Sequence, residues 1–202
     1  MSDIVYLVRH ADYVFADGLE PENRPSHLSR AGRVQAYVLA LRLRFLRIDA
    51  IYTSSYTRAH ETAMIISKVT GAPLFIDDRF AEFSPSGTAR GVNFKEARTR
   101  ARRERDWHES GGQSFNDSVR RFSEALNDAA LQKYARPCVV THALVLQNFL
   151  LVQTNNTEPP ELDTASITAF SPNAQGFVPL STNTQPFPSM HKITKILRYL
   201  IG

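Results

Sequence analysis

Short apolar runs alternate with segments of helical periodicity along this chain. The runs have the length of buried strands, and they occupy residues 4–10, 48–53, 74–76 and 137–141. Apolar residues at helical spacing occupy residues 58–69, 114–134 and 143–152 and a helix that begins after Ser29. Strands that alternate with helices are typical of βαβ units. The pattern therefore predicts an α/β protein with a mostly parallel sheet.

Local residues support the ends of several of these helices. Ser29 is expected to cap the first helix, and Gly71 is expected to end the second. Ser114 and Asp117 have the spacing of a capping box at the start of the helix that runs to about residue 134. The first helix carries four apolar residues on one side, namely Val34, Val38, Leu41 and Phe45.

Two further segments are expected after the strand at 137–141. Residues 166–170 and 177–180 flank a turn and are typical of an antiparallel hairpin, which would finish one edge of the sheet. The C-terminal residues carry apolar side chains at helical spacing, namely Ile193, Ile196, Leu197 and Leu200. Such a helix either docks on the domain or binds a membrane surface or a partner.

Side chains able to bind and attack a phosphate follow three of the predicted strands. Arg9 and His10 end the first strand, and His142 follows the last of the four. In open α/β sheets, ligands gather at the carboxyl ends of the strands. Arg58 follows the second strand at the start of a helix, where the helix dipole adds positive potential. The sequence therefore indicates an anion site that contains a nucleophile.

Five ordered segments carry a resemblance to a known family. They are residues 7–10, 28–36, 53–63, 80–82 and 139–142, which read LVRH, LSRAGRVQA, TSSYTRAHETA, FAE and VVTH. Their order resembles that of the histidine phosphatase (phosphoglycerate mutase-like) superfamily, from Val5 to about Leu150. The resemblance implies a three-layer α/β/α fold with a mostly parallel central sheet. The length of 202 residues fits a single domain over residues 1–202, with a basic helical insertion around 90–106.

The resemblance implies that Arg9, His10, Arg58 and His142 form a phosphate pocket. His10 is the expected nucleophile, because neutral imidazole is available near pH 7 and in-line attack on phosphorus gives a phosphohistidine. Arg9 and Arg58 offer forked donors to the phosphoryl oxygens. His142, if protonated beside the phosphate, supplies a third positive donor.

Glu82 is the expected general acid, which protonates the leaving oxygen and later activates water. It lies in Phe-Ala-Glu, which resembles the Leu-x-Glu motif of the family. Asp77 and Asp78 lie in the same loop and are the alternatives. Ser54 and Ser55 are expected to cap the helix that follows them or to hydrogen-bond the phosphate.

Three positions depart from the family pattern. Ala11 and Ala143 stand where the family has glycine after each histidine, and a positive φ at either alanine would cost about 1 kcal/mol. The asparagine that mutases carry shortly after Arg-His is missing here. The pattern thus favours a metal-independent phosphatase that hydrolyses phosphate monoesters through a phosphohistidine. The alternatives are phosphoglycerate mutase-type phosphoryl transfer and a non-catalytic phospho-ligand binder.

Other chemistries lack their motifs in this chain. It has no Gly-x-Ser-x-Gly elbow, no P-loop and no dinucleotide fingerprint. Four further histidines, His27, His60, His108 and His191, lack the paired spacing of metal ligands. We therefore expect an enzyme that needs neither a metal nor another cofactor.

The net charge of +4 is concentrated in one segment. Residues 90–106 hold seven basic and three acidic residues, so they account for the whole excess. Flanking glycines make this segment a candidate flap, in which Arg98, Arg102 and Arg105 would bind negative charge on the substrate beyond the phosphate. A solvated helix face is the alternative. No nucleic-acid module accompanies the charge, so the expected partner is a small phosphorylated substrate, polyanionic if the flap exists.

Cysteine usage and apolar run length bear on the compartment. Cys138 is the only cysteine and lies in an apolar strand, so it is expected to be a structural thiol in a reducing compartment. The apolar stretch at residues 4–8 is too short for a signal-peptide core, and no run reaches the length of a membrane span. We therefore expect a cytoplasmic protein without a membrane partner. The sequence carries no signal for the oligomeric state or the physiological substrate.

Overall fold

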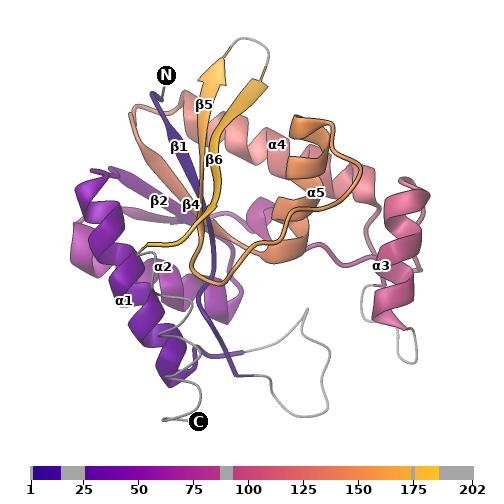
Figure 1. Ribbon diagram of the computed structural model, residues 1–202, viewed down its shortest axis with the longest axis horizontal. Coiled ribbons are helices and arrows are strands. Elements are labelled where there is room, and N and C mark those ends of the chain that lie inside the picture. Colours follow the sequence, from indigo (N-terminus) through magenta and orange to yellow (C-terminus); the bar gives the residue numbers. More distant parts are fainter. Residues whose placement is uncertain (1, 15–25, 87–92, 174–175, 187–202) are drawn as a thin grey trace.

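The computed structural model describes residues 2–14, 26–86, 93–173 and 176–186. Within these residues the strands are β1 (Val5–Arg9), β2 (Ala50–Thr53), β3 (Leu74–Ile76), β4 (Pro137–Thr141), β5 (Ile167–Asn173) and β6 (Gly176–Thr184). They form one sheet in the order β3-β2-β4-β1-β5-β6 (Figure 1). The first four strands are mutually parallel, whereas β5 is antiparallel to β1 and β6 to β5. The predicted α/β class with a mostly parallel sheet is confirmed.

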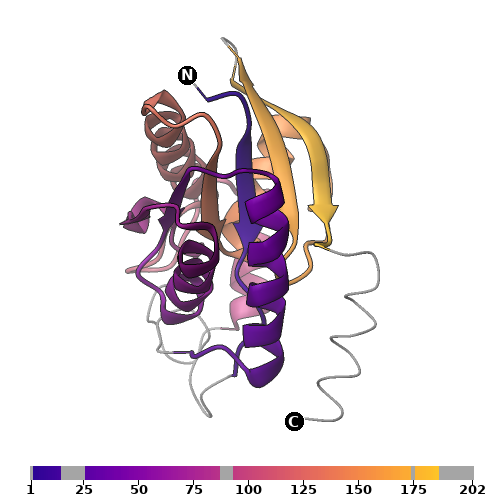
Figure 2. The same cartoon turned by 90° about the vertical axis from the view of Figure 1, so that its left-hand side faces the viewer.

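Helices cover both faces of this sheet (Figures 1 and 2). On one face lie α1 (Arg30–Phe45) and α2 (Thr57–Thr70), and on the other lie α4 (Phe115–Leu131) and α5 (Ala143–Thr154). The helix α3 (Phe94–Arg103) and a short 3-10 turn, η1 (Asp78–Phe80), come before α4 in the chain. The structure therefore has the expected three layers, α/β/α.

The strand β1 lies between two hydrophobic cores. Tyr6 and Val8 contribute to the core beneath α1 and α2, whereas Val5 and Leu7 contribute to the core beneath α4 and α5. Successive strand residues face opposite sides, so a strand buried on both faces is a continuous apolar run in the sequence. Each fully buried aliphatic side chain stabilises the folded state by roughly 1.5–3 kcal/mol relative to an exposed one. Burial on both faces makes β1 a rigid support for the residues at its carboxyl end.

The helix α1 buries a side made of small residues, two leucines and a glutamine, rather than the apolar side that the sequence emphasises. Its buried residues are Ala31, Gly32, Gln35, Ala36, Leu39, Ala40 and Leu43. A Cβ atom on Gly32 would lie 1.8 Å from the Asp12 carbonyl oxygen, so the backbones are too close for large side chains there. Ser29 caps the helix as predicted, because its Oγ accepts a hydrogen bond from the Gly32 N–H at 2.9 Å.

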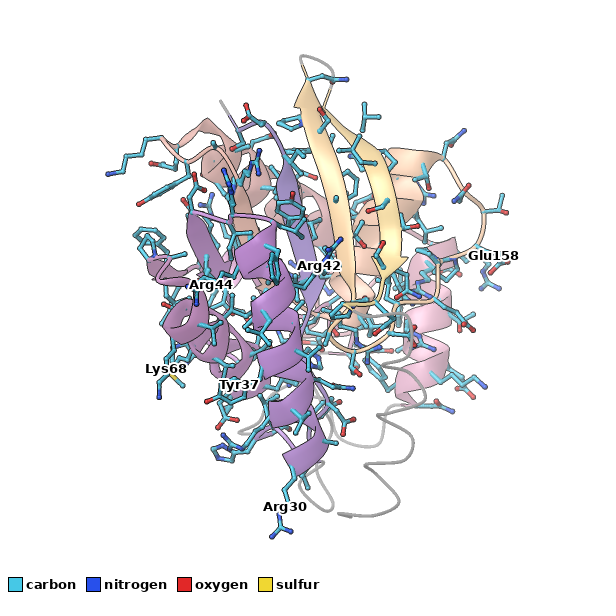
Figure 3. The ribbon with its side chains drawn as sticks, turned by 60° about the vertical axis from the view of Figure 1, so that its left-hand side comes forward. Arg30, Tyr37, Arg42, Arg44, Lys68 and Glu158 are labelled. Carbon is cyan, nitrogen blue, oxygen red and sulfur yellow. The ribbon has the colours of Figure 1, made fainter. Side chains whose placement is uncertain are left out.

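Of the four apolar residues predicted for one side of α1, three are exposed and Val38 is half-buried. Val34, Leu41 and Phe45 are 40%, 47% and 80% exposed. Tyr37 of α1 is also exposed, and Figure 3 shows it between Arg30 at one end of the helix and Arg42 and Arg44 near the other. The apolar periodicity identified the helix correctly, but it does not mark the side that packs on the sheet.

Other predicted boundaries differ from the structure by a few residues. Gly71 ends α2 with a φ of +79°, which glycine adopts without strain. Ser114 Oγ accepts a hydrogen bond from the Asp117 N–H at 3.0 Å, as predicted for the start of α4. That helix ends at Leu131 because Gln132 is extended. The predicted hairpin is β5 and β6, and it forms one edge of the sheet.

One of the predicted segments is described in part, and another lies entirely outside the described residues. The helix α3 lies within the basic segment 90–106, but its flanking glycines Gly87 and Gly91 lie outside the described residues. The helix predicted around residues 193–200 also lies outside them. Among the helices that the structure describes, none is long and apolar enough to cross a membrane.

Candidate active site

The register of β1 and β4 brings His10 and His142 together. Arg9 lies opposite Thr141 in this parallel pair, so the histidines that follow leave the sheet side by side. The His10 N–H donates to the Thr141 carbonyl at 2.9 Å, and the two imidazole rings are 5.2 Å apart. Both side chains are buried. Two positions that are 132 residues apart in the sequence therefore form one site.

Arg58 reaches the same site from the strand on the other side of β4. β2 ends at Thr53, opposite Val140, and α2 begins four residues later. Arg58 lies in the first turn of α2, and its Nε donates to His10 Nε2 at 3.2 Å. Tyr13 and Tyr56 flank the guanidinium, with the Arg58 Cζ 5.0 and 5.3 Å from their ring centres. These contacts orient a buried positive charge toward His10.

The hydrogen bonds of His10 define its tautomer. Nδ1 lies 2.8 Å from the Ala11 carbonyl oxygen, and a carbonyl can only accept, so Nδ1 carries the hydrogen. Nε2 therefore keeps its lone pair and accepts from Arg58. Burial holds the pKa of His10 well below its ordinary value, and the charges of Arg58 and Arg9 lower it further. His10 is thus a neutral imidazole whose Nε2 can act as a nucleophile.

Three residues of this site have a buried nitrogen atom without a hydrogen-bond partner among the described residues. Within the part of the chain that the structure describes, Arg58 Nη1, Arg9 Nε and His142 Nδ1 make no hydrogen bond. Arg9 is fixed by its Nη1, which donates to the Leu162 carbonyl. A buried donor left unpaired costs roughly 1–3 kcal/mol, and an anion at this place would offer these groups acceptors.

The surroundings of His142 favour its neutral form. Burial holds its pKa well below the ordinary value, and Arg58 is the next largest cause. Its Nε2 lies 2.8 Å from Ser54 Oγ. The expectation that Ser54 or Ser55 caps α2 is wrong, because the N-cap is Tyr56 and it makes no side-chain capping bond. Ser54 contacts the histidine instead.

The Glu82 carboxylate binds the first turn of α5, although Glu82 itself belongs to the loop after η1. Its Oε1 accepts hydrogen bonds from the N–H groups of Phe83 and Val145, both at 2.9 Å, and Oε2 accepts from the Leu144 N–H at 3.3 Å. Because α5 begins directly after His142, these bonds hold the carboxylate at N–H groups two and three residues along the chain from that histidine. Its negative charge raises the pKa of Arg9, against the larger lowering by burial.

The two alternative carboxylates have other partners. Asp77 accepts hydrogen bonds from the guanidinium of Arg79, the shortest of them at 2.7 Å. Asp78 Oδ1 accepts from the Ser55 N–H at 2.7 Å. The structure thus brings Glu82, and neither aspartate, into contact with the start of α5.

A comparison with protein families identifies this fold. The model of the histidine phosphatase superfamily (branch 1) matches residues 5–185. The chain belongs to this superfamily. The match extends from β1 to β6, so all five predicted site residues of this histidine phosphatase lie inside it.

Named relatives include phosphatases and a mutase. The chain is 30% identical over 178 residues to the metal-independent phosphoserine phosphatase of Arabidopsis thaliana. The alignment covers 81% of this chain and 74% of the relative. It is 28% identical over 157 residues to the probable phosphoglycerate mutase GpmB of Erwinia tasmaniensis, with 70% of each chain covered. Identity to the putative phosphoserine phosphatase 2 of Hydrogenobacter thermophilus is 38% over 81 residues, or 40% of each chain.

Solved structures share the architecture at lower identity. Mycobacterial hydrolase 2 superposes with a TM-score of 0.76, at 19% identity, over 98% of this chain and 97% of its own. At this low identity, the similarity shows a shared fold and nothing more. The three-layer arrangement of this histidine phosphatase therefore has a counterpart of known structure.

The alanines that replace family glycines introduce no backbone strain. Among the described residues, positive φ values outside glycine occur at Arg47, Asn155, Ala165 and Asn183. Ala11 and Ala143 therefore have conformations that L-residues adopt readily. The energetic cost considered for a positive φ does not arise at either position.

Two tyrosines at the site were not predicted. Tyr56 precedes Arg58 by two residues within the segment 53–63, so its place in that segment could have singled it out. Tyr13 follows His10 by three residues, and no periodicity or motif marks it. Its contact with Arg58 depends on the packing of the β1 end against α2.

We expect acid to destabilise the folded protein through His10 and His142. Their folded-state pKa values lie well below about 6.5, so under more acidic conditions the unfolded state takes up protons that the folded state does not. The contribution of these two histidines to the free energy of unfolding is then constant above that pH. Below it, it falls by up to about 1.4 kcal/mol per pH unit for each histidine.

Urea unfolding between pH 7.5 and 5 measures this effect. His10→Gln should flatten the fall in stability, because the substituted side chain does not titrate. His108→Gln is the matched control, since His108 is exposed. Equal slopes for the wild type and His10→Gln would contradict the expectation.

Proposed function

We propose that this chain is a metal-independent phosphomonoesterase that works through a phosphohistidine on His10. One observation carries the proposal. The unprotonated Nε2 of a buried His10 accepts from Arg58, and within the described residues Arg9, Arg58 and His142 each have a buried nitrogen atom that makes no hydrogen bond. Such a constellation can hold the three oxygens of a phosphoryl group around a nucleophile.

In the first half-reaction, the lone pair of His10 Nε2 forms the bond to phosphorus as the ester P–O bond breaks. The electron pair of that bond goes to the leaving oxygen, which takes a proton from Glu82. Oε2 is the better placed oxygen for this proton, because it accepts one long hydrogen bond while Oε1 accepts two short ones. Arg9 and Arg58 stabilise the equatorial oxygens.

In the second half-reaction, the Glu82 carboxylate takes a proton from water as the water oxygen attacks phosphorus. The N–P bond breaks and its electron pair returns to His10 Nε2, which restores the neutral imidazole. The phosphate dianion favours a protonated His142, because its charge opposes the effect of the arginines on that pKa. This is the state in which His142 acts as a third positive donor.

A phosphoglycerate mutase is the nearest alternative, since GpmB is among the relatives. The missing asparagine after Arg-His favours hydrolysis. Phosphate release and isomerisation of 3-phosphoglycerate, measured in parallel, separate the two. We expect phosphate release from both an aryl phosphate and an alkyl phosphate. For each ester, adding EDTA should leave the rate unchanged. Isomerisation without release would support the mutase, and no turnover of either ester would support a non-catalytic binder.

We further propose a small substrate that carries negative charge beyond the cleaved phosphate. Arg98 and Arg102 lie four residues apart on α3, and burial lowers the pKa of Arg102, as does the nearby charge of Arg98. Arg102 donates to Gln147 and Asn148, one turn into the helix whose first turn binds Glu82. Within the described residues, Arg98 Nε is buried without a partner.

The third arginine predicted for this group lies elsewhere. Arg105 stacks over the ring of Phe115, with its Cζ 4.9 Å from the ring centre. The proposed anion subsite therefore consists of Arg98 and Arg102. Two relatives are named as phosphoserine phosphatases, and phosphoserine has a carboxylate as well as a phosphate.

We expect Arg98→Gln combined with Arg102→Gln to raise KM for phosphoserine and 3-phosphoglycerate by about tenfold or more, since a charge-assisted hydrogen bond contributes roughly 1.5–3 kcal/mol. KM for an aryl phosphate should change little. Arg103→Gln is the matched control, because Arg103 lies on the same helix with its side chain 76% exposed. Equal changes for both classes of substrate would remove these arginines from the site.

Residues 1–202 are proposed to form a single histidine phosphatase domain, with the basic helical insertion around 90–106. The family match over residues 5–185 supports this organisation. A cytoplasmic location is proposed as well. Cys138, a buried free thiol in β4 whose pKa is raised by burial, is compatible with a reducing compartment.

A further inference from the structure

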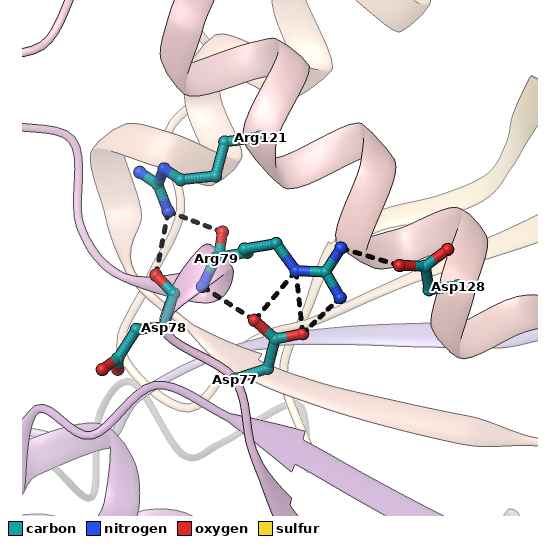
Figure 4. A network of polar contacts seen from close by, with 5 residues as sticks. All are labelled: Asp77, Asp78, Arg79, Arg121 and Asp128. Carbon is teal, nitrogen blue, oxygen red and sulfur yellow. Dashed lines mark hydrogen bonds and ion pairs between the residues drawn. The ribbon is translucent and has the colours of Figure 1, made fainter.

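The turn that leads into Glu82 is held by an arginine from α4 (Figure 4). Arg121 Nη1 donates to the carbonyl oxygens of Asp78, Arg79 and Ala81 at 3.3, 2.5 and 3.1 Å. Its Nη2 donates to Ala81 again at 3.1 Å. The Ala81 carbonyl belongs to the peptide bond that leads into Glu82. One guanidinium therefore fixes the backbone directly before the proposed general acid.

Further contacts on either side complete the fixation. Thr141 Oγ1, at the end of β4, donates to the Phe80 carbonyl at 2.8 Å. The carbonyl oxygens of residues 78 to 81 are thus all bound by side chains of α4 or β4. Gln113 Oε1 in turn accepts from Arg121 Nη2 at 2.9 Å, which orients the guanidinium.

The outer side of the same turn has a separate network. Arg79 binds Asp77 and, through Nη1, Asp128 at 2.7 Å (Figure 4). This network lies partly in solvent, because the side chains of Arg79 and Asp128 are 41% and 58% exposed. Arg121 is half-buried, and it lies close enough to Glu82 and His142 for charge to act between them.

We propose that Arg121 is a positioning residue for the general acid, holding the Ala81–Glu82 peptide so that the Glu82 carboxylate meets the first turn of α5 beside His142. The inference rests on the proposed function, in which Glu82 protonates the leaving oxygen. The five donors of a planar guanidinium are spread over three nitrogens and can bind several carbonyls at once, whereas the three donors of lysine share one nitrogen. Charge acts in the same direction, because Glu82 and Arg121 attract one another.

The test compares kcat/KM for an alkyl and an aryl phosphate in Arg121→Gln and Arg121→Lys. Alkyl leaving groups need the proton from Glu82 and aryl leaving groups hardly do, so a displaced acid lowers the alkyl-to-aryl ratio. We expect that ratio to fall by about tenfold to a hundredfold in Arg121→Gln and by less in Arg121→Lys. Loss of folded protein cannot produce this result, since both substrates report on the same folded fraction.

A double-mutant cycle with Glu82→Gln decides whether Arg121 acts through the acid. In the Glu82→Gln background, Arg121→Gln should lower the ratio no further. Arg120→Gln is the matched control, because Arg120 is the adjacent residue of α4, with its side chain 70% exposed. Its ratio should equal that of the wild type.

The outcomes separate this inference from the proposed function. Equal losses on both substrates in Arg121→Gln, or a further fall in the Glu82→Gln background, would overturn the positioning role while leaving Glu82 as the acid. An unchanged ratio in Glu82→Gln itself would overturn the acid assignment, and the positioning role with it.

Discussion

His10→Ala is expected to lower kcat/KM for every phosphate ester by roughly a thousandfold or more. The substitution removes Nε2, the atom that forms the bond to phosphorus, while Arg9, Arg58 and His142 can still bind the phosphate. Steady-state phosphate release measures the loss, and far-ultraviolet circular dichroism checks the fold. His108→Ala, an exposed histidine outside the site, is the matched control. Activity of His10→Ala within tenfold of the wild type would contradict the assignment.

Glu82→Gln is expected to slow alkyl phosphates by roughly a hundredfold to ten-thousandfold in kcat/KM. Glutamine keeps the shape of the side chain but has no proton to give to an alkoxide. Aryl phosphates should lose much less in kcat/KM, because their leaving groups depart without protonation. Measuring kcat/KM for a matched pair of esters separates proton donation from binding.

The alternative carboxylates of the same loop are the controls for this prediction. Asp77→Asn and Asp78→Asn should leave the alkyl-to-aryl ratio unchanged, because Asp77 binds Arg79 and Asp78 binds the Ser55 backbone. A selective loss on alkyl phosphates in Asp78→Asn would move the acid to that residue. Equal losses on both esters in Glu82→Gln would indicate a binding role for Glu82.

The central part of the site could be predicted because it depends on strands. A strand buried on both faces is a continuous apolar run, so the ends of β1 and β4 could be located and His10 and His142 identified. Parallel strands carry their carboxyl ends to the same edge of the sheet, which brings the two histidines together. Arg58 followed from its place at the start of α2. The resemblance to the histidine phosphatases added Glu82.

Features that depend on packing could not be predicted. The periodicity of α1 predicted a helix, but the close approach of the Asp12 backbone to Gly32 decides which side is buried. Serine is a common N-cap residue, yet Ser54 hydrogen-bonds His142 instead, because the fold brings that histidine next to it. Arg121 contacts Ala81, 40 residues earlier in the sequence. Contacts of this kind arise only when α4 packs against the turn.

Trapping the phosphoenzyme tests the central claim most directly. Wild-type protein, mixed with an isotopically labelled phosphate ester and quenched within a turnover, should carry label that is stable in base and labile in acid. Peptide mapping should place it on His10, and His10→Ala should carry none. Label that persists undiminished in His10→Ala, or that maps to another residue, would contradict the phosphohistidine mechanism.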